Sequence, residues 1–180
     1  MGMNRIGFLG GWAAAAAAAL IPARVFGIDL RRRALWLRYD DGQEVNAYFT
    51  VDGHSIYRPG YDELCWLLRD RHVPWREGYV DIDIVEIEVL WEVQQTLFMR
   101  GVREPFVVSS GYRTPQTNAT IEGAVRNSQH CYGRAVDMWV PGMSMRDLFN
   151  ACWARERAGG VGYYDDHIHL DSGARRWWTE

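Results

Sequence analysis

The sequence contains no lysine, so arginine supplies all 20 of its cationic side chains. We attribute this bias first to codon composition and only second to a functional choice of arginine. The arginines are outnumbered by 23 acidic residues, and the formal net charge of −3 is small. A chain without an excess of positive charge lacks the electrostatic footprint of nucleic-acid-binding proteins. We therefore expect no nucleic-acid partner.

Cysteine is also scarce. The three residues, Cys65, Cys131 and Cys152, are an odd number and show no C-x-x-C spacing. These numbers exclude a disulfide framework, because at most one pair could form. We expect most of them to be small buried hydrophobic residues.

No apolar run reaches the length of about 20 residues that a membrane-spanning helix usually needs. The longest run, residues 6–21, follows Arg5 and includes seven consecutive alanines, and residues 22–27 offer small residues to a signal peptidase. A positive start, an apolar centre and small residues at its end are typical of an export signal. We predict that residues 1–27 are a signal peptide or a membrane anchor and that residues 28–180 form one domain. An alanine-rich helix of the fold is the alternative.

The rest of the sequence shows the patterns of an α+β domain. Alternating apolar and polar residues predict a β-hairpin at 34–39 and 44–51. Amphipathic periodicity and capping residues predict helices at residues 61–71, 83–100, 115–124 and 144–157. Further strands are predicted at residues 106–110, 134–140, 160–164 and 167–171. We therefore expect a small antiparallel sheet packed with helices.

Two short polar clusters stand out. The first runs from Ser128 to Asp137 and contains His130, and the second is Asp166-His167-Ile-His169-Leu-Asp171. Side chains two apart on a strand point the same way, so His167, His169 and Asp171 share one face. Gly133 permits a tight turn in the first cluster, which could bring His130 back beside Asp137. The side chains of both clusters are thus candidates for one site.

The residue types in these clusters predict a metal site. Two imidazoles and one carboxylate are a known ligand set of catalytic zinc, and they leave a fourth position for water. Zinc lowers the pKa of that water toward about 7 and polarises a carbonyl group. A nearby base must still move protons, and both His167 and Asp171 are placed to do so. By contrast, His54 and His72 stand beside turn-like or charged residues, and we expect them to be surface residues or hydrogen-bonded core residues without a metal.

Four motifs in order resemble one family. They are Ser110-Gly-Tyr-Arg-Thr-Pro-Gln-Thr-Asn-Ala119, Ser128-x-His130-x-x-Gly-x-Ala-x-Asp137, Gly160-Val-Gly-Tyr-Tyr164 and His169-Leu-Asp-Ser-Gly173 followed by Trp177. Together they look like murein endopeptidase K and its relatives, within the zinc peptidase clan of D-Ala-D-Ala carboxypeptidases, lysostaphin-type endopeptidases and the hedgehog domain. The resemblance covers residues 33–178. It implies a hedgehog-like fold whose sheet carries the zinc site.

The resemblance also implies a ligand set and an activity. One zinc ion per chain would be held by His130, Asp137 and His169, in a periplasmic enzyme of a Gram-negative-type bacterium. The substrates would be the stem peptides of peptidoglycan, and the bond a peptide cross-link, including the direct link between two diaminopimelate residues. The position of His167 is often aromatic in this branch. Its histidine here matches the wider clan, where the first histidine of H-x-H assists catalysis.

Further residues are candidates to contact the substrate. Arg113 could bind a substrate carboxylate through its planar fork, or could instead pair with an acidic neighbour. Arg126 is a second candidate of the same kind. We expect Ser128 to hydrogen-bond within the loop that orients His130. Of Tyr163 and Tyr164, we expect one to line the cleft and the other to pack, and we select Tyr164 for the cleft.

Three other functions remain open. A D-Ala-D-Ala carboxypeptidase would use the same chemistry, and a non-catalytic wall-binding module could keep the same fold. A wall-degrading component of a phage or gene-transfer particle would share the catalysis, but the export signal argues against it. Neither the bond that is cut nor the oligomeric state can be read from the motifs, and inner-membrane anchoring through residues 1–27 is possible.

Overall fold

The computed structural model describes residues 31–180 of the chain. The predicted signal peptide or anchor, residues 1–27, lies outside the described residues. No helix within residues 31–180 is long and apolar enough to cross a membrane.

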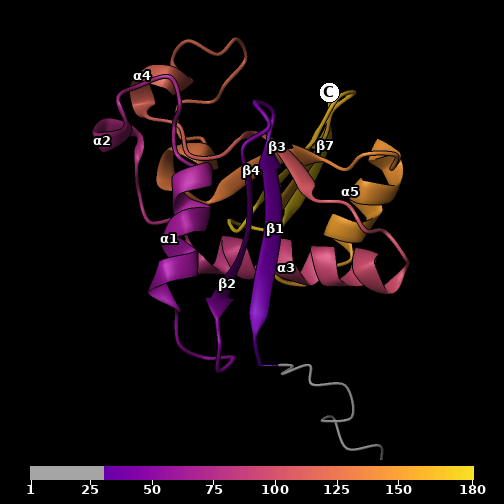
Figure 1. Cartoon of the computed structure of the whole chain (residues 1–180). Coiled ribbons are helices and arrows are strands. Elements are labelled where there is room, and N and C mark those ends of the chain that lie inside the picture. The colour runs from indigo at the N-terminus through magenta and orange to yellow at the C-terminus, as the bar shows by residue number, and fades with distance from the viewer. Residues whose placement is uncertain (1–30) are drawn as a thin grey trace, which may run out of the picture. The chain divides into compact units, whose positions relative to one another are not determined.

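A seven-stranded sheet forms the centre of the fold (Figure 1). Its strands are β1 (Arg33–Tyr39), β2 (Glu44–Thr50), β3 (Phe106–Ser110), β4 (Ala135–Trp139), β5 (Gly160–Tyr163), β6 (Ile168–Asp171) and β7 (Arg176–Thr179). The spatial order is β2-β1-β3-β4-β6-β5-β7. The β1–β3 and β5–β7 pairs are parallel, and the other pairs are antiparallel. The predicted α+β class is confirmed, but the sheet is larger than expected. It is also mixed, because two pairs of strands that are not consecutive in the sequence, β1–β3 and β5–β7, are parallel.

Helices of different lengths connect the strands. They are α1 (Arg58–Leu67), α2 (Trp75–Gly78), α3 (Ile84–Met99), α4 (Pro115–Asn118), the 3₁₀ turn η1 (Gln129–Tyr132) and α5 (Met145–Trp153). Side-chain oxygens cap three of the α-helices at their N-termini, and the caps are Asp83 for α3, Thr114 for α4 and Ser144 for α5. Such caps satisfy backbone N–H groups that have no partner within the helix. They explain why these three helices begin where the sequence predicts.

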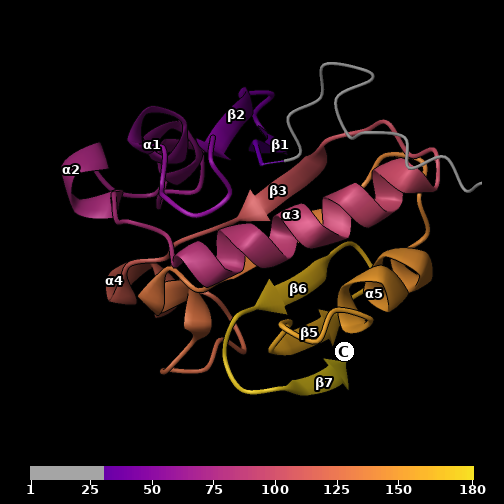
Figure 2. The same ribbon diagram turned by 90° about the horizontal axis from the view of Figure 1, so that it is seen from below.

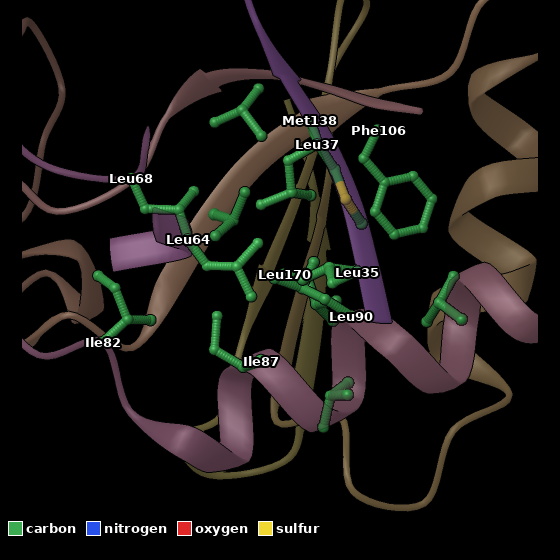
Figure 3. Close-up of a cluster of buried hydrophobic side chains, with 14 of the residues drawn as sticks. Leu35, Leu37, Leu64, Leu68, Ile82, Ile87, Leu90, Phe106, Met138 and Leu170 are labelled. Atoms are coloured by element: carbon green, nitrogen blue, oxygen red, sulfur yellow. The ribbon is translucent and has the colours of Figure 1, made fainter. Parts of the chain in front are cut away.

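Helices cover one face of the sheet. Figure 2 shows α3 running beneath the sheet, with α1 and β2 to one side of it and α5 with β5 to β7 to the other. The core between these layers contains apolar side chains from both strands and helices (Figure 3), among them Leu35, Leu64, Leu90, Met138 and Leu170. Successive side chains of a strand point to opposite faces, so the polar residues next to Met138 on β4 and Leu170 on β6 point away from this core.

Several boundaries differ from the prediction. Helix α1 begins at Arg58 rather than residue 61, since Pro59 is tolerated in the first turn of a helix. Gly60 is needed there because a Cβ atom would lie 2.1 Å from the carbonyl oxygen of Tyr48 on β2. The helix predicted at 115–124 ends at Asn118, and α2, η1 and β7 were not predicted.

Candidate metal centre

Asp137 and His169 are placed by strand register. The antiparallel strands β4 and β6 pair Asp137 directly with His169. Their neighbours Val136, Ile168 and Leu170 are fully buried in the core on the opposite face, as predicted for Ile168 and Leu170. Apolar burial on one face of the strands therefore fixes both polar side chains on the other.

His130 comes from the turn η1, which precedes β4. The side chain of Ser128 caps this turn by accepting a hydrogen bond from the backbone N–H of His130 at 3.4 Å. Gly133 ends the turn in the left-handed conformation, with φ of +65°, which favours glycine. The imidazole Nδ1 of His130 lies 2.6 Å from the carbonyl oxygen of Gly111. With the proton on Nδ1, that hydrogen bond leaves Nε2 free to bind a metal.

Three ligand atoms meet in one place. Nε2 of His130 lies 3.1 Å from both Oδ1 of Asp137 and Nδ1 of His169, and the last two atoms are 2.9 Å apart. The three residues form a potential metal site and are 1%, 5% and 8% exposed. Nitrogen and oxygen ligands about 2.0–2.1 Å from a tetrahedral zinc lie about 3.3 Å apart. The cluster thus fits zinc after a spread of a few tenths of an ångström.

The charges of the cluster suit a cation. Burial lowers the pKa of His130, which favours the neutral imidazole that a metal requires. Burial opposes ionisation of Asp137, but His130 and His169 outweigh it and hold the pKa of this carboxyl well below its usual range. Burial also disfavours a charged His169, yet its hydrogen bonds to Asp137 and Asp171 raise its pKa. A metal bound here would therefore displace a proton from His169, the one of the three whose protonated form these contacts favour.

Asp171 supports the cluster from behind. Its Oδ2 atom lies 2.9 Å from Nε2 of His169, and its side chain is fully buried. Its oxygens also accept hydrogen bonds from the backbone of Gly160 and Gly173 and from the guanidinium of Arg176. Although burial opposes ionisation, hydrogen bonds from His169 and Arg176 lower the pKa of Asp171 strongly. A carboxylate with every oxygen engaged in this way orients its histidine.

His167 stands at the mouth of the cluster. It lies just before β6 rather than within it, and its Nε2 atom is 3.9 Å from Oδ1 of Asp137. Its Nδ1 atom contacts Oδ1 of Asp166 at 2.6 Å, and its ring stacks on Tyr164 with centroids 4.3 Å apart. Both contacts hold the imidazole with Nε2 toward the cluster.

A cavity of about 350 Å³ opens over the ligand atoms, and His167 and Tyr164 line it. The ring of Tyr163 instead packs against Phe149. Arg126 is exposed and does not line the cavity, although its neighbours Val125 and Asn127 do. Of the predicted substrate contacts, the structure thus brings Tyr164, but not Arg126, to the cluster.

Arg113 joins the cluster through Asp137. Its Nη2 atom donates to Oδ2 of Asp137, and its Nε atom donates to Oγ of Ser110 at 2.7 Å. The pairing with an acidic neighbour, one of the two alternatives for this residue, is therefore present. Arg113 also lines the cavity, so its remaining donors are available to a ligand.

The C-terminal strand β7 supplies cavity residues that sequence reasoning missed. Trp178 lies beside His169, with ring centroids 5.1 Å apart, and its indole N–H donates to the hydroxyl of Tyr164 at 2.9 Å. Arg176 of β7 and Glu180, which follows the strand, line the same cavity. The run Arg175-Arg-Trp-Trp178 has no apolar–polar alternation, so the strand could not be recognised. The only signal was the aromatic pair close after His169.

The surface histidines and the cysteines behave as expected. His54 and His72 are exposed, and all three cysteines are free, with Cys65 and Cys152 buried. Cys131 is half-buried and is not part of the metal cluster despite following His130. A buried set of two histidines and one aspartate, beneath an open cavity, defines a mononuclear zinc hydrolase.

Comparison with known proteins specifies the family. A family model described as Peptidoglycan L,D-endopeptidase MepK matches residues 29–178. The chain is 32% identical over 178 residues to the peptidoglycan L,D-endopeptidase MepK of Escherichia coli strain K12, covering 94% of this chain and 93% of that protein. It is 33% identical over 148 residues to a probable peptidoglycan L,D-endopeptidase MepK of Haemophilus influenzae, covering 76% of each.

A more distant relative is the zinc D-Ala-D-Ala carboxypeptidase of Streptomyces albus G, 31% identical over 114 residues, or 58% of this chain and 43% of that protein. The chain belongs to the peptidoglycan L,D-endopeptidase MepK family of zinc metallopeptidases. This membership confirms the resemblance found in the four motifs.

Proposed function

We propose that this zinc metallopeptidase hydrolyses peptide cross-links between the stem peptides of peptidoglycan, including the link between two diaminopimelate residues. The observation that carries the proposal is the buried cluster of His130, Asp137 and His169 beneath an open cavity. Zinc held by these three residues supplies a Lewis acid that polarises a peptide carbonyl and makes water more acidic. The chain's own side chains orient the substrate and move the proton.

We assign proton transfer to His167 rather than to Asp171. Nε2 of His167 faces the cluster, 3.9 Å from Oδ1 of Asp137, while Nδ1 is held by Asp166. A histidine in that position can take a proton from water at the cluster and deliver it to the leaving amine. Asp171 is fully buried, and its oxygens are engaged by His169, Arg176 and two backbone N–H groups. Its role in this proposal is to hold His169 in position.

Arg113 acts in two ways in this proposal. Its bond to Oδ2 of Asp137 turns Oδ1 toward the two histidines. Its remaining donors can bind a carboxylate next to the scissile bond. Tyr164 and Trp178 form an aromatic wall against which the peptide can lie. Arg126, exposed at the edge of the loop, remains a weaker candidate for the same substrate.

Residues 1–27 are assigned to export, as a cleaved signal peptide or an inner-membrane anchor, with the enzyme domain in the periplasm. In support, the family model begins to match at residue 29, just after the predicted end of the signal. Sequencing the N-terminus of protein recovered from periplasmic and membrane fractions would separate the two forms. We also place the fold with the hedgehog and D-Ala-D-Ala peptidase clan, on the strength of the distant carboxypeptidase relative.

The test is digestion of diaminopimelate-type sacculi by protein starting near Asp29, with products identified by mass spectrometry. We expect cross-linked dimers to fall to monomers, and the product masses to identify the bond. Asp137→Ala should abolish the reaction, whereas Asp165→Asn, at an exposed position nearby, should leave it unchanged. Release of terminal D-alanine alone would instead indicate a carboxypeptidase. Binding to sacculi without any cleavage would indicate a wall-binding module.

A further inference from the structure

A second cavity adjoins the metal centre. It has a volume of about 270 Å³, and the residues that it shares with the first cavity are Arg113, Ile121, Asp137 and His167. Its remaining walls include Arg69 and Arg71, which follow helix α1. Because both cavities meet at the ligand Asp137, a chain bound across the site would extend into each of them.

Arg69 is a cation without an anionic partner in this cavity. Its guanidinium lies over the ring of Trp66, 4.0 Å from the centroid, and its Nη1 atom donates to the carbonyl oxygen of Trp66 at 2.5 Å. Within residues 31–180 it forms no salt bridge. Burial and the neighbouring charge of Arg71 lower the pKa of Arg69, and Asp41 and Tyr39 offset this only in part. An anion beside Arg69 would oppose the repulsion from Arg71.

Two of the other charged groups around this cavity, Arg71 and Asp70, already have hydrogen-bond partners. Arg71 donates to the carboxylate of Asp41 and to Oε1 of Gln43. The carboxylate of Asp70 is buried and accepts hydrogen bonds from Thr114 and from the backbone of His72.

The two remaining acids lie toward the metal centre. Asp166 contacts His167, and Asp137 is held by Arg113 and the histidines. Apart from Arg113, whose remaining donors also line the first cavity, Arg69 is therefore the arginine of this cavity that no carboxylate among the described residues pairs with.

We propose that Arg69 anchors a carboxylate-binding subsite in the second cavity, which holds a free carboxylate of the stem peptide on one side of the scissile bond. This inference rests on the proposed function. The second cavity shares lining residues with the first, so a group of the stem peptide close to the scissile bond can reach it. Stem peptides of the diaminopimelate type carry such groups on glutamate and on diaminopimelate.

Arg69→Gln and a matched control test the subsite. The control is Arg76→Gln, which removes the same charge from an arginine that also lies over a tryptophan, Trp75, but lines neither cavity. The substrates are purified cross-linked dimers in three forms: with free carboxylates, with the glutamate carboxylate amidated, and with the diaminopimelate carboxylate amidated. Thermal unfolding of each variant verifies that it is folded.

We expect Arg69→Gln to raise KM for the free-acid dimer about tenfold, with kcat within about twofold, because a charge-assisted hydrogen bond is lost. One of the two amidated dimers should show the same rise with the wild-type enzyme and no further rise with Arg69→Gln. That dimer identifies the carboxylate. Arg76→Gln should match the wild type. Equal KM values for Arg69→Gln and wild type, or the same loss on all three dimers, would overturn the proposal.

Failure of the proposed function would be seen separately. If the wild type hydrolyses none of the dimers, calorimetry of monomeric stem peptides still measures the subsite. A preference of about tenfold for the free acid that disappears in Arg69→Gln supports it. Equal affinity of both proteins for free and amidated peptides overturns it.

Discussion

Nε2 of His169 lies 2.9 Å from Oδ2 of Asp171, a carboxylate that is completely buried behind the metal cluster. The other imidazole nitrogen, Nδ1, is the one that faces His130 and Asp137. This arrangement fixes which nitrogen is presented to the metal, and it holds the ring in place before any ligand binds.

Asp171→Asn should therefore weaken zinc binding, because the histidine loses its charged partner. Loss of such a partner typically costs 10-fold to 100-fold in metal affinity. Competition with a chromophoric chelator measures the affinity directly. Asp165→Asn serves as the control, since Asp165 is exposed in the turn that leads to His167. Unchanged affinity in Asp171→Asn would show that this contact does not orient the ligand.

His167→Gln should slow catalysis without loss of zinc. Removing a positioned proton-transfer group typically costs about 10²-fold to 10⁴-fold in rate. We expect that loss in kcat for cross-linked dimers, with the zinc content of the purified protein unchanged. The control is His54→Gln, since His54 is exposed and distant from His167 in the sequence, and it should retain wild-type kcat. A His167→Gln enzyme with normal kcat would show that another group transfers the proton.

Glu86 should lower the stability of the protein at neutral pH. This residue of α3 is fully buried, and neither carboxyl oxygen has a hydrogen-bond partner among the described residues. Burial and the charges of Asp171 and Asp83 raise the pKa of Glu86 well above its usual value. Between the ordinary glutamate pKa and the raised pKa of Glu86, the folded chain binds more protons than the unfolded chain. The free energy of unfolding therefore falls as the pH rises through this range.

Glu86→Gln should remove this slope, and its stability advantage over the wild type should grow from pH 4.5 toward pH 7. Glu86→Leu should gain about 1–3 kcal/mol at pH 7, since an unsatisfied buried polar group costs about that much. Urea unfolding at several pH values measures both effects. The exposed Glu63→Gln should track the wild type. Parallel curves for Glu86→Gln and wild type would contradict the account.

Gly162 should be required for the position of Trp178 in the cavity wall. A Cβ atom on Gly162 would lie 2.6 Å from the indole ring of Trp178, closer than packed atoms allow. We expect Gly162→Ala to cost about 1–3 kcal/mol of stability, the usual range for overpacking. In a Trp178→Ala background the same substitution should cost much less, because the clash is gone. Additive losses in the double variant would mean that the indole is not the obstacle.

The ligand set was accessible from the sequence because its residues lie in two short segments with distinctive spacing. His130 and Asp137 are separated by one turn, and His169 lies on a strand whose apolar neighbours determine its face. The hairpin of β1 and β2 and the long helix α3 were predicted for the same reason, since local periodicity and caps determine them.

Features that depend on distant contacts were not accessible. The parallel pairing of β5 with β7 brings Trp178 into the cavity, although the sequence of β7 carries no strand pattern. Glu86 looks like a solvent-facing residue of a helix, yet it is fully buried on α3. The choice between His167 and Asp171 for proton transfer depends on which carboxylate oxygens already have hydrogen-bond partners, and only three-dimensional contacts reveal those partners.

The most direct test of the central claim is a zinc titration of the metal-free enzyme followed on a cross-linked dimer. We predict that activity rises linearly to one zinc per chain and then stays constant, and that metal analysis of Asp137→Ala finds no bound zinc. Activity that survives complete removal of the metal, or an Asp137→Ala protein that still holds one zinc, would contradict the assignment of His130, Asp137 and His169 as the catalytic metal centre.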